Sequence, residues 1–326
     1  MIEINPISDA SIAKAVTHLK AGRLVAFPTE TVYGLGADAT NASAVAQIFA
    51  AKQRPEFNPL ISHVASPDAA FALGTETPIA TALSNAFWPG PLTLILQRKS
   101  PCLVDMLTTA GLDKIGLRVP AHSGAQLLLK AFGKPLAAPS ANRSGKISPS
   151  TADHVIQGLG ENIGFLLDGG PCESGLESTI VDCTGSNACL LRPGGITRDA
   201  MVTALADAGL DPSITIARPL NDKAKPIAPG QLMSHYAPRA KLRLAAETGQ
   251  RGEEMIGFGT IRGAGELQLN LSPSGNLVEA AANLFSMLHA ADATKTTNIA
   301  IAPIPDNGLG EAINDRLSRA AAPRVS

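Results

Sequence analysis

The sequence predicts an α/β fold in two domains, the first of which is built on a largely open sheet. Candidate strands and amphipathic helices are mixed along the first 210 residues, as expected for one α/β domain. The stretch from Asp211 to Pro238 is rich in proline and has no periodic apolar face. The 326 residues exceed the usual ~100–200 residues of one domain, so a second domain is expected after that stretch.

The elements of the first domain are expected in regular succession. Ser8 can cap a helix that ends at Gly22 and carries apolar residues on one face. Residues 24–27 then form a buried strand that Pro28 stops. Further strands are expected at 60–64, 92–96, 115–119, 165–168, 179–182 and 190–192, and further helices at 43–52, 79–88, 124–132 and 197–208.

The boundaries follow from the proline-rich stretch. We assign residues 1–210 to the first domain, 211–238 to an extended linker and 239–326 to a smaller α/β unit. In that unit, strands are expected at 241–245, 255–258 and 298–302, and helices at 277–290 and 309–321.

Composition narrows the function classes. The net charge of −1 offers no general electrostatic attraction for DNA or RNA. The longest apolar runs are far below the ~20 residues of a membrane helix, and the N-terminus lacks a signal-peptide pattern. We therefore expect a cytoplasmic protein. No CxxC pair occurs among the four cysteines, which disfavours zinc ribbons and thioredoxin-like sites.

Two segments are similar to known nucleotide-binding motifs but do not match them. The segment ending in Lys146 lacks the first glycine and the final Ser or Thr of a P-loop. Gly257, Gly259 and Gly263 miss the GxGxxG spacing by one residue. Neither segment therefore predicts a standard nucleotide-binding loop.

Five polar groups instead lie at the ends of predicted strands or helices of the first domain, or directly after them. Ligand sites of open α/β sheets form at the carboxyl ends of strands. Each group also has a structural explanation, such as a polar turn, a helix C-terminus that favours cations, or an arginine that faces solvent. The groups are residues 28–36, Lys52 with Arg54, Arg118, residues 137–148, and residues 177–179 with 192–195.

At these residues the sequence resembles the Sua5/YrdC family of threonylcarbamoyl-AMP synthases, and in particular its long two-domain Sua5-type members. The matching stretches of the first domain are PTETVYGLG, AKQRPEFNPL, WPGPLTLIL, GLRVPAH, APSANRSGKISPS, ESTIVD and LLRPGG. APGQLMSHYAP resembles the linker motif of the family, and GLGEAINDRLSRAA resembles the end of its second domain. The resemblance implies a YrdC-like open twisted mixed sheet with flanking helices and a smaller Rossmann-like C-terminal domain.

The resemblance also implies a reaction and its participants. L-Threonine, bicarbonate or carbon dioxide, and ATP with Mg²⁺ would give threonylcarbamoyl-AMP and pyrophosphate. Separate downstream proteins would then transfer the group to tRNA, which this step does not require. No metal-binding side chain is assigned. The nucleotide positions would be Lys52, Arg54, Glu56, Ser140, Asn142, Ser148, Arg192, His235 and Tyr236, of which Lys52, Arg54 and Arg192 would be catalytic. The threonine positions would be Thr29, His63, Arg118, Ala138 and Ser178.

Two other functions compete with this prediction. A carbamoyl-transfer module like that of hydrogenase maturation proteins is disfavoured, because the chain has neither an acylphosphatase region nor cysteine-rich zinc fingers. An RNA-binding or ribosome-associated module is disfavoured by the charge and by the scarcity of aromatic residues. The linker also departs from some members at Leu232, Met233 and Ser234, where those members carry a Lys-Tyr-basic run.

Overall fold

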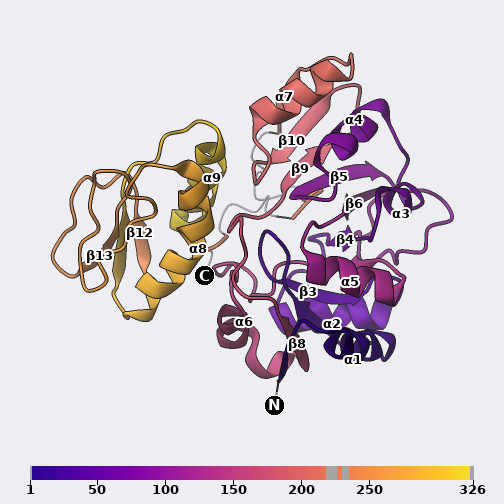
Figure 1. Cartoon of the computed structure of the whole chain (residues 1–326), viewed down its shortest axis with the longest axis horizontal. Coiled ribbons are helices and arrows are strands. Elements are labelled where there is room, and N and C mark those ends of the chain that lie inside the picture. Colours follow the sequence, from indigo (N-terminus) through magenta and orange to yellow (C-terminus); the bar gives the residue numbers. More distant parts are fainter. Residues whose placement is uncertain (1, 218–225, 230–234, 324–326) are drawn as a thin grey trace.

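The computed structural model describes residues 2–217, 226–229 and 235–323. In these residues the chain forms an eleven-stranded sheet and a separate three-stranded sheet. Figure 1 shows the two units side by side, with the second unit presenting two helices to the first. The predicted departure at Leu232, Met233 and Ser234 lies outside the described residues.

The large sheet is mixed, as the resemblance implied. Parallel and antiparallel neighbours alternate irregularly across it. Its order is β1 (Glu3–Pro6), β8 (Phe165–Asp168), β2 (Val25–Phe27), β3 (Gly34–Asp38), β7 (Leu136–Ala137), β4 (Ile61–His63), β6 (Lys114–Arg118), β5 (Leu92–Gln97), β9 (Thr179–Asp182), β10 (Ala188–Arg192) and β11 (Ile214–Ile216).

Helices cover both faces of this sheet. Alternate residues of β2 point into different cores: Ala26 joins one cluster, whereas Val25 and Phe27 join another. Side-chain caps start the helices, for example Ser8, which forms a capping box with Ser11. The helices are α1 (Asp9–Lys20), α2 (Ala42–Lys52), α3 (Pro67–Phe71), α4 (Pro78–Phe87), α5 (Ser123–Phe132), α6 (Ala152–Leu159), the short 3₁₀ helix η1 (Gly160–Asn162) and α7 (Arg198–Asp207).

Some elements of the first domain were not predicted. Strand β3 falls in the stretch expected to be a polar turn, because its glycines hide the strand pattern. They are needed where a ring packs on the backbone, since a Cβ on Gly36 would lie 2.9 Å from Cε1 of Phe27. Strand β1 is largely exposed, and α3 and α6 are short. Strand β11 pairs with β10 inside the segment expected to be linker, so the sheet continues past residue 210.

The second unit is a small parallel α/β domain. Its strands are β12 (Lys241–Arg243), β14 (Asn298–Ile301) and β13 (Glu253–Ile256), in that order, and its helices are α8 (Leu277–Ala293) and α9 (Leu309–Ala321). The expected strands and helices of this region are therefore confirmed, with end points that differ by up to three residues.

The two units share a core. Val32, Ile147 and Leu176 of the first domain belong to the same buried cluster as Phe285 and Leu317 of α8 and α9. Tyr236 also belongs to this cluster. Among the described residues, no helix combines the length and apolar character that crossing a bilayer requires.

Candidate active site

A narrow cavity of about 50 Å³ opens where several strands of the large sheet end. Residues from the first domain and from the described linker segments 226–229 and 235–238 surround it. Its lining consists of Thr29, Thr31, Val32, Gly34, Arg54, Ile61, His63, Arg118, Ala138, Pro139, Ser140, Glu177, Ser178, Arg192, Pro229, His235 and Tyr236.

Sheet register brings Arg118 and His63 together. Strands β4 and β6 are parallel neighbours, and the two residues are register partners at their carboxyl ends. Nη2 of Arg118 donates to Oε1 of Glu30 at 2.8 Å and to Oγ1 of Thr31 at 2.9 Å. Arg118 is 4% exposed, and its Nε has no hydrogen-bond partner. This arginine is therefore held in place on one side and retains a donor on the other.

His63 is neutral in this setting. Burial, reinforced by the charge of Arg118, lowers the pKa of His63 to about 3. Its Nδ1 has no hydrogen-bond partner, and the ring meets Phe27 edge to face. A neutral imidazole offers one donor and one acceptor to a polar ligand.

Two cations lie at the C-terminal end of α2, but only one of them lines the cavity. Arg54 lines the cavity and donates from Nε and Nη2 to the carbonyls of Asn58 and Pro59 at 3.2 and 2.9 Å. Burial lowers the pKa of Arg54 to about 10, which still leaves it charged at neutral pH. Nζ of Lys52 instead donates to the carbonyls of Ser140 and Asn142, both at 2.5 Å. Lys52 thus ties α2 to the loop that carries Ser140.

Arg192 and Ser178 form a compact pair at the other side of the cavity. Nε and Nη2 of Arg192 donate to the carbonyl of Ser178 at 3.2 and 2.9 Å, and Nη2 lies 3.2 Å from its Oγ. That hydroxyl also lies 2.8 Å from Oγ1 of Thr93 on β5. Burial lowers the pKa of the Arg192 guanidinium from its usual value. The pair joins the start of β9 to the end of β10.

Glu177 is the carboxylate of the cavity lining. Its Oε1 accepts from Oγ of Ser148 at 2.5 Å, and its Oε2 accepts from Nε of Arg316 at 2.7 Å. Burial by itself would raise the pKa of Glu177, but Arg316 and Arg192 together with these hydrogen bonds hold that pKa below its usual value. Glu177 is therefore an ionised group in a lining whose other charged residues are arginines.

His235 and Tyr236 cover the cavity from the linker. Both are buried, and their rings meet at a centroid distance of 4.2 Å. Tyr236 adopts a positive φ of 63°, which turns the chain sharply at this point. Burial, with the nearby Arg54 and Lys52, lowers the pKa of His235 well below its usual value. Nδ1 of His235 and the hydroxyl of Tyr236 have no hydrogen-bond partner.

Buried polar atoms without partners gather around this cavity. Native proteins pair more than about 90% of buried polar groups, so such a cluster indicates a place where a polar ligand completes the hydrogen bonding. Within the described part of the chain, those at or beside the lining are Oε2 of Glu30, Nδ1 of His63, Nε of Arg118, Oδ1 of Asn142, Nδ1 of His235 and the hydroxyl of Tyr236.

The structure separates the residues named by the resemblance into two groups. The cavity lining includes Thr29, Arg54, His63, Arg118, Ala138, Ser140, Ser178, Arg192, His235 and Tyr236. The others lie around it: Lys52 and Asn142 support the loop of Ser140, Ser148 contacts the lining through Glu177, and Glu56 is exposed.

Sequence reasoning missed three residues of this network. Thr31 and Glu177 lie inside matched motifs, next to residues that were named. Arg316 comes from the second domain, and its signal is a lone charge on an apolar helical face. It lies between Ile313 and Ala320, which are both buried in α9.

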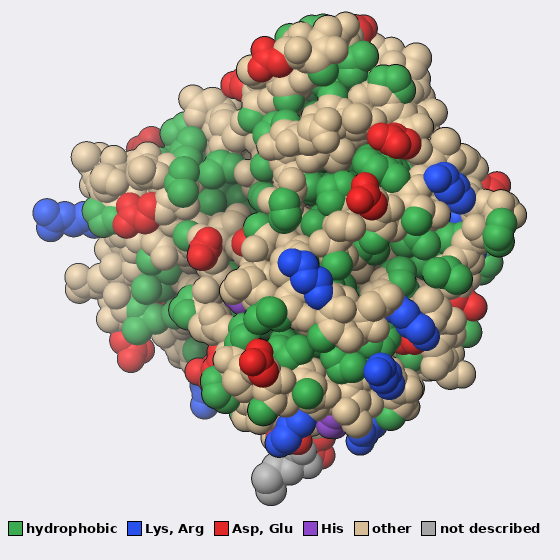
Figure 2. Space-filling view, turned by 45° about the vertical axis from the view of Figure 1, so that its right-hand side comes forward, with side chains coloured by type: hydrophobic (Ala, Val, Ile, Leu, Met, Phe, Trp, Pro, Cys, Tyr) green, Lys and Arg blue, Asp and Glu red, His purple; other side chains and the backbone are tan. Residues whose placement is uncertain are grey.

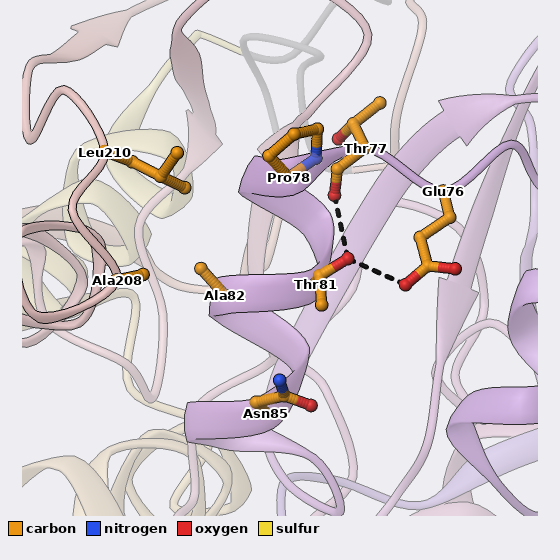
Figure 3. A pocket seen from close by; sticks show the side chains of 8 residues that line it. All are labelled: Glu76, Thr77, Pro78, Thr81, Ala82, Asn85, Ala208 and Leu210. Carbon is orange, nitrogen blue, oxygen red and sulfur yellow. Dashed lines mark hydrogen bonds between the residues drawn. The ribbon is translucent and has the colours of Figure 1, made fainter.

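Two other grooves have fewer charged side chains than the central cavity. Figure 3 shows an open groove between α4 and the end of α7, in which the hydroxyl of Thr81 donates to Glu76 and to the carbonyl of Thr77. A second open groove follows β13, beside Arg262 and Asn270. On the face seen in Figure 2, positive and negative side chains are scattered among uncharged surface. Neither groove gathers charges as the central cavity does.

Comparison with known families accounts for both units. Residues 17–194 match the family model Sua5_yciO_yrdC, described as "Telomere recombination". Residues 196–322 match the model described as "Threonylcarbamoyl-AMP synthase, C-terminal domain".

Individual proteins match over almost the whole chain. A protein of Bacillus subtilis named threonylcarbamoyl-AMP synthase is 39% identical, over 98% of this chain and 95% of its own length. One of the same name from Pyrococcus abyssi is 37% identical, over 98% and 96%. The crystal structure of P. abyssi Sua5 complexed with L-threonine superposes with a TM-score of 0.86 at 35% identity, covering 98% of this chain and 97% of that one.

Escherichia coli YciO shares only the fold of the first domain. It superposes with a TM-score of 0.54 at 22% identity, over 60% of this chain. Full-length similarity is therefore found with the two-domain proteins, and this chain belongs to the Sua5-type, two-domain branch of the threonylcarbamoyl-AMP synthase family.

Proposed function

We propose that this protein is an L-threonylcarbamoyl-AMP synthase, a nucleotidyltransferase that joins L-threonine, bicarbonate or carbon dioxide, and ATP, and releases pyrophosphate. The observation that carries the proposal is the covered cavity lined by Arg54, Arg118 and Arg192 in a chain of this family. Three buried cations suit substrates that carry negative charge, namely the phosphates of ATP and the carboxylate of threonine.

The threonine end is assigned to the side of the cavity around Arg118. The Nε of Arg118, which has no partner in the protein, is available to the carboxylate of threonine in a charge-assisted hydrogen bond. Neutral His63, Thr29 and Ser178 offer polar contacts to the rest of the amino acid. Ala138 leaves room for the substrate backbone. A related structure, that of P. abyssi Sua5, was solved with L-threonine.

The nucleotide end is assigned to the side around Arg54 and Arg192. Both guanidiniums are held by backbone carbonyls, so they are oriented before the phosphates arrive. Ser140, His235 and Tyr236 complete this side of the lining. Lys52, Asn142 and Ser148 would act on the nucleotide mainly by holding the loops around it.

The reaction needs no protein nucleophile. The amine of threonine adds to carbon dioxide, or displaces water from bicarbonate, to give a carbamate. An oxygen of the carbamate attacks the α-phosphorus of ATP, and the bond to the oxygen that bridges to the β-phosphorus breaks. Pyrophosphate leaves with that electron pair. Arg54 and Arg192 stabilise the charge that develops, and the cover of His235 and Tyr236 keeps water from the carbamate and the adenylate.

Mg²⁺ would enter as part of the ATP substrate. Among the described residues, no three His, Cys, Asp or Glu side chains gather in a metal-binding group. The two carboxylates beside the arginines, Glu30 and Glu177, are each paired with an arginine. Phosphate oxygens and water are ligands that Mg²⁺ prefers, so the protein residues fit a metal carried by the nucleotide.

The product of this reaction is unstable in water. The mixed anhydride of threonylcarbamoyl-AMP is easily hydrolysed, so separate tRNA threonylcarbamoyl-transfer proteins of the cytoplasm would take it up. Binding of tRNA would not be needed for this step.

A direct assay tests the activity. Purified protein with ATP, Mg²⁺, bicarbonate and L-threonine should release pyrophosphate and form a threonylcarbamoyl adduct of AMP that mass spectrometry detects. Omission of threonine, bicarbonate or Mg²⁺ should stop both, and tRNA should be unnecessary. Pyrophosphate release that is independent of threonine and bicarbonate would contradict the proposal and would reopen the RNA-binding alternative.

A further inference from the structure

Helix α9 of the second domain places a buried arginine against the first domain. Arg316 is 0% exposed and is the largest of the fully buried side chains. Its three nitrogens all have acceptors: Nε donates to Glu177 at 2.7 Å, Nη2 to the carbonyl of Pro193 at 2.9 Å, and Nη1 to Asp315 at 2.6 Å. Two of these three acceptors belong to the first domain.

Those two acceptors are next in sequence to residues that line the cavity. Glu177 lies beside Ser178, and Pro193 lies beside Arg192. The two turns already touch, because a Cβ on Gly194 would lie 2.4 Å from the carbonyl oxygen of Glu177. The guanidinium of Arg316 therefore bridges the turn before β9 and the turn after β10, the two places from which Ser178 and Arg192 enter the cavity.

The same arginine also supports the cover. The Cζ atom of Arg316 lies 5.2 Å from the ring centroid of Tyr236, a cation–π distance. Phe285 of α8 also packs against this ring, with centroids 5.7 Å apart. Tyr236 is thus held by α8 and α9 of the second domain while it lines the cavity of the first.

Stability alone is a weak explanation for this arrangement. A buried ion pair gains little over well-packed apolar residues, because both charges lose their hydration. An orienting role accounts for features that a simple anchor does not need, namely three donors directed to three acceptors and a carboxylate that lines the cavity.

We propose that Arg316 is a positioning residue supplied by the second domain, which holds Glu177 and the turns of Ser178 and Arg192 so that the site is complete only when the domains are docked. The inference rests on the proposed synthase function. It gives the second domain a part in forming the site, in addition to closing the linker over it.

The chain offers a matched control on the same helix. Glu311 of α9 forms an ion pair with Arg198 of α7 across the domains. That pair is partly exposed, and neither residue lines the cavity. Glu311→Gln therefore weakens the docking of α9 without touching Glu177 or its partners.

The test measures synthesis by the full-length protein from pH 4 to pH 9, with melting temperatures of every variant. Arg316→Met should lower kcat by about 10- to 100-fold, because the two turns lose their orientation. The acidic limb of its pH profile, which is the pH range in which the rate falls on acidification, should shift to higher pH by about one unit or more. The reason is that Glu177 loses its main cation. Arg316→Lys should keep the limb near that of the unmodified protein, and Arg316→Met combined with Glu177→Gln should abolish the limb. Glu311→Gln should change neither rate nor profile.

Two results would overturn the inference. One is a folded Arg316→Met protein with normal kcat and an unmoved acidic limb. The other is a loss of rate in Glu311→Gln as large as that in Arg316→Met, which would make α9 an anchor only. If the unmodified protein makes no adduct, the proposed function fails, and ATP binding by calorimetry decides the inference. Arg316→Met should then bind ATP about tenfold or more weakly than Glu311→Gln, and equal affinities, or no binding by either, would refute it.

Discussion

At the residue scale, the site depends on buried charges whose hydrogen-bonding capacity is only partly used by the protein. Arg118 is the clearest case, since Glu30 and Thr31 hold one side of its guanidinium while Nε keeps no partner. From its place in a strand alone, this arginine could have faced solvent or gripped an anion. The structure places it in the buried lining, where burial makes an unpaired donor costly until a ligand accepts from it.

The first residue-scale prediction concerns Arg118→Ala. A charge-assisted hydrogen bond contributes ~1.5–3 kcal/mol, so the variant should use threonine roughly 10- to 150-fold less well, measured as kcat/KM for threonine at saturating ATP. The melting temperature should also fall, because the variant leaves Glu30 buried without its cation.

A second variant separates the two effects. Arg118→Ala combined with Glu30→Gln should recover much of the lost melting temperature and none of the threonine use. Normal threonine dependence in Arg118→Ala would remove this arginine from the substrate site.

At the scale of elements, helices α6 and α8 meet across the domains through a pair of histidines. The rings of His154 and His289 stack with centroids 3.8 Å apart. His289 also contacts the carbonyl of Ser148 at 3.2 Å, next to the network of Glu177. Burial, and the neighbouring His154, lower the pKa of His289 to about 4, and burial lowers the pKa of His154. Both rings are therefore neutral in the folded protein near pH 7.

An acid sensitivity follows from this pair. An unfolded histidine has a pKa of about 6.5, so below that pH the unfolded chain binds more protons than the folded one. The stability associated with His289 should be complete above about pH 6.5 and should decline as the pH falls toward 4, by up to about 3 kcal/mol. Asp153 and Asp292 oppose this decline, because they favour the protonated rings.

Melting temperatures between pH 7.5 and pH 5 check this prediction. His289→Gln, which retains a donor for the Ser148 carbonyl, should show a smaller drop than the unmodified protein. His18→Gln, which alters a less buried ring on α1, should keep most of the drop. Equal drops in all three proteins would show that the stacked pair does not set the acid limit.

At the scale of the whole molecule, the second domain and the linker complete a site that the first domain begins. The cavity of about 50 Å³ is far smaller than the several hundred Å³ that a nucleotide with an amino acid requires. His235 and Tyr236 must therefore move for the substrates to enter. Two of the cores formed by the large sheet consist of buried residues of the first domain alone, so this domain has its own basis for folding.

This division predicts the behaviour of a shortened protein. A chain that ends after Ala217 keeps β11 on the sheet and should fold, whereas a chain that ends near Leu210 loses that strand. Both should lose most synthesis, because they lack the cover and Arg316. Circular dichroism and the adduct assay measure the two properties. Synthesis at the full rate by either chain would make the linker a tether and would remove His235 and Tyr236 from the site.

Proteolysis of the intact protein tests the movement itself. We expect ATP with threonine to slow cleavage between Asp211 and Pro238, since bound substrates favour the covered arrangement. A cleavage rate that is the same with and without the two ligands would contradict the proposal that the linker closes over the site.

Local sequence patterns determined most of the elements. Apolar spacing and Ser, Thr or Asn caps specify helices such as α2, because these interactions are made within a few residues. Strands such as β8 and β9 were predicted at their observed bounds, because short β-branched and apolar runs suit a buried sheet. The same reasoning failed for glycine-rich β3, whose need for glycine arises from the distant ring of Phe27.

Which polar groups come into contact in the site depends on the tertiary fold. The register of β4 and β6 brings His63 to Arg118, although no local pattern encodes which strands pair. Arg316 and Glu177 are 139 residues apart in the chain and belong to different domains. Their contact depends on how α9 docks against the first domain, which is a long-range packing event. In the sequence, the only sign of it is a lone charge on the apolar face of a helix.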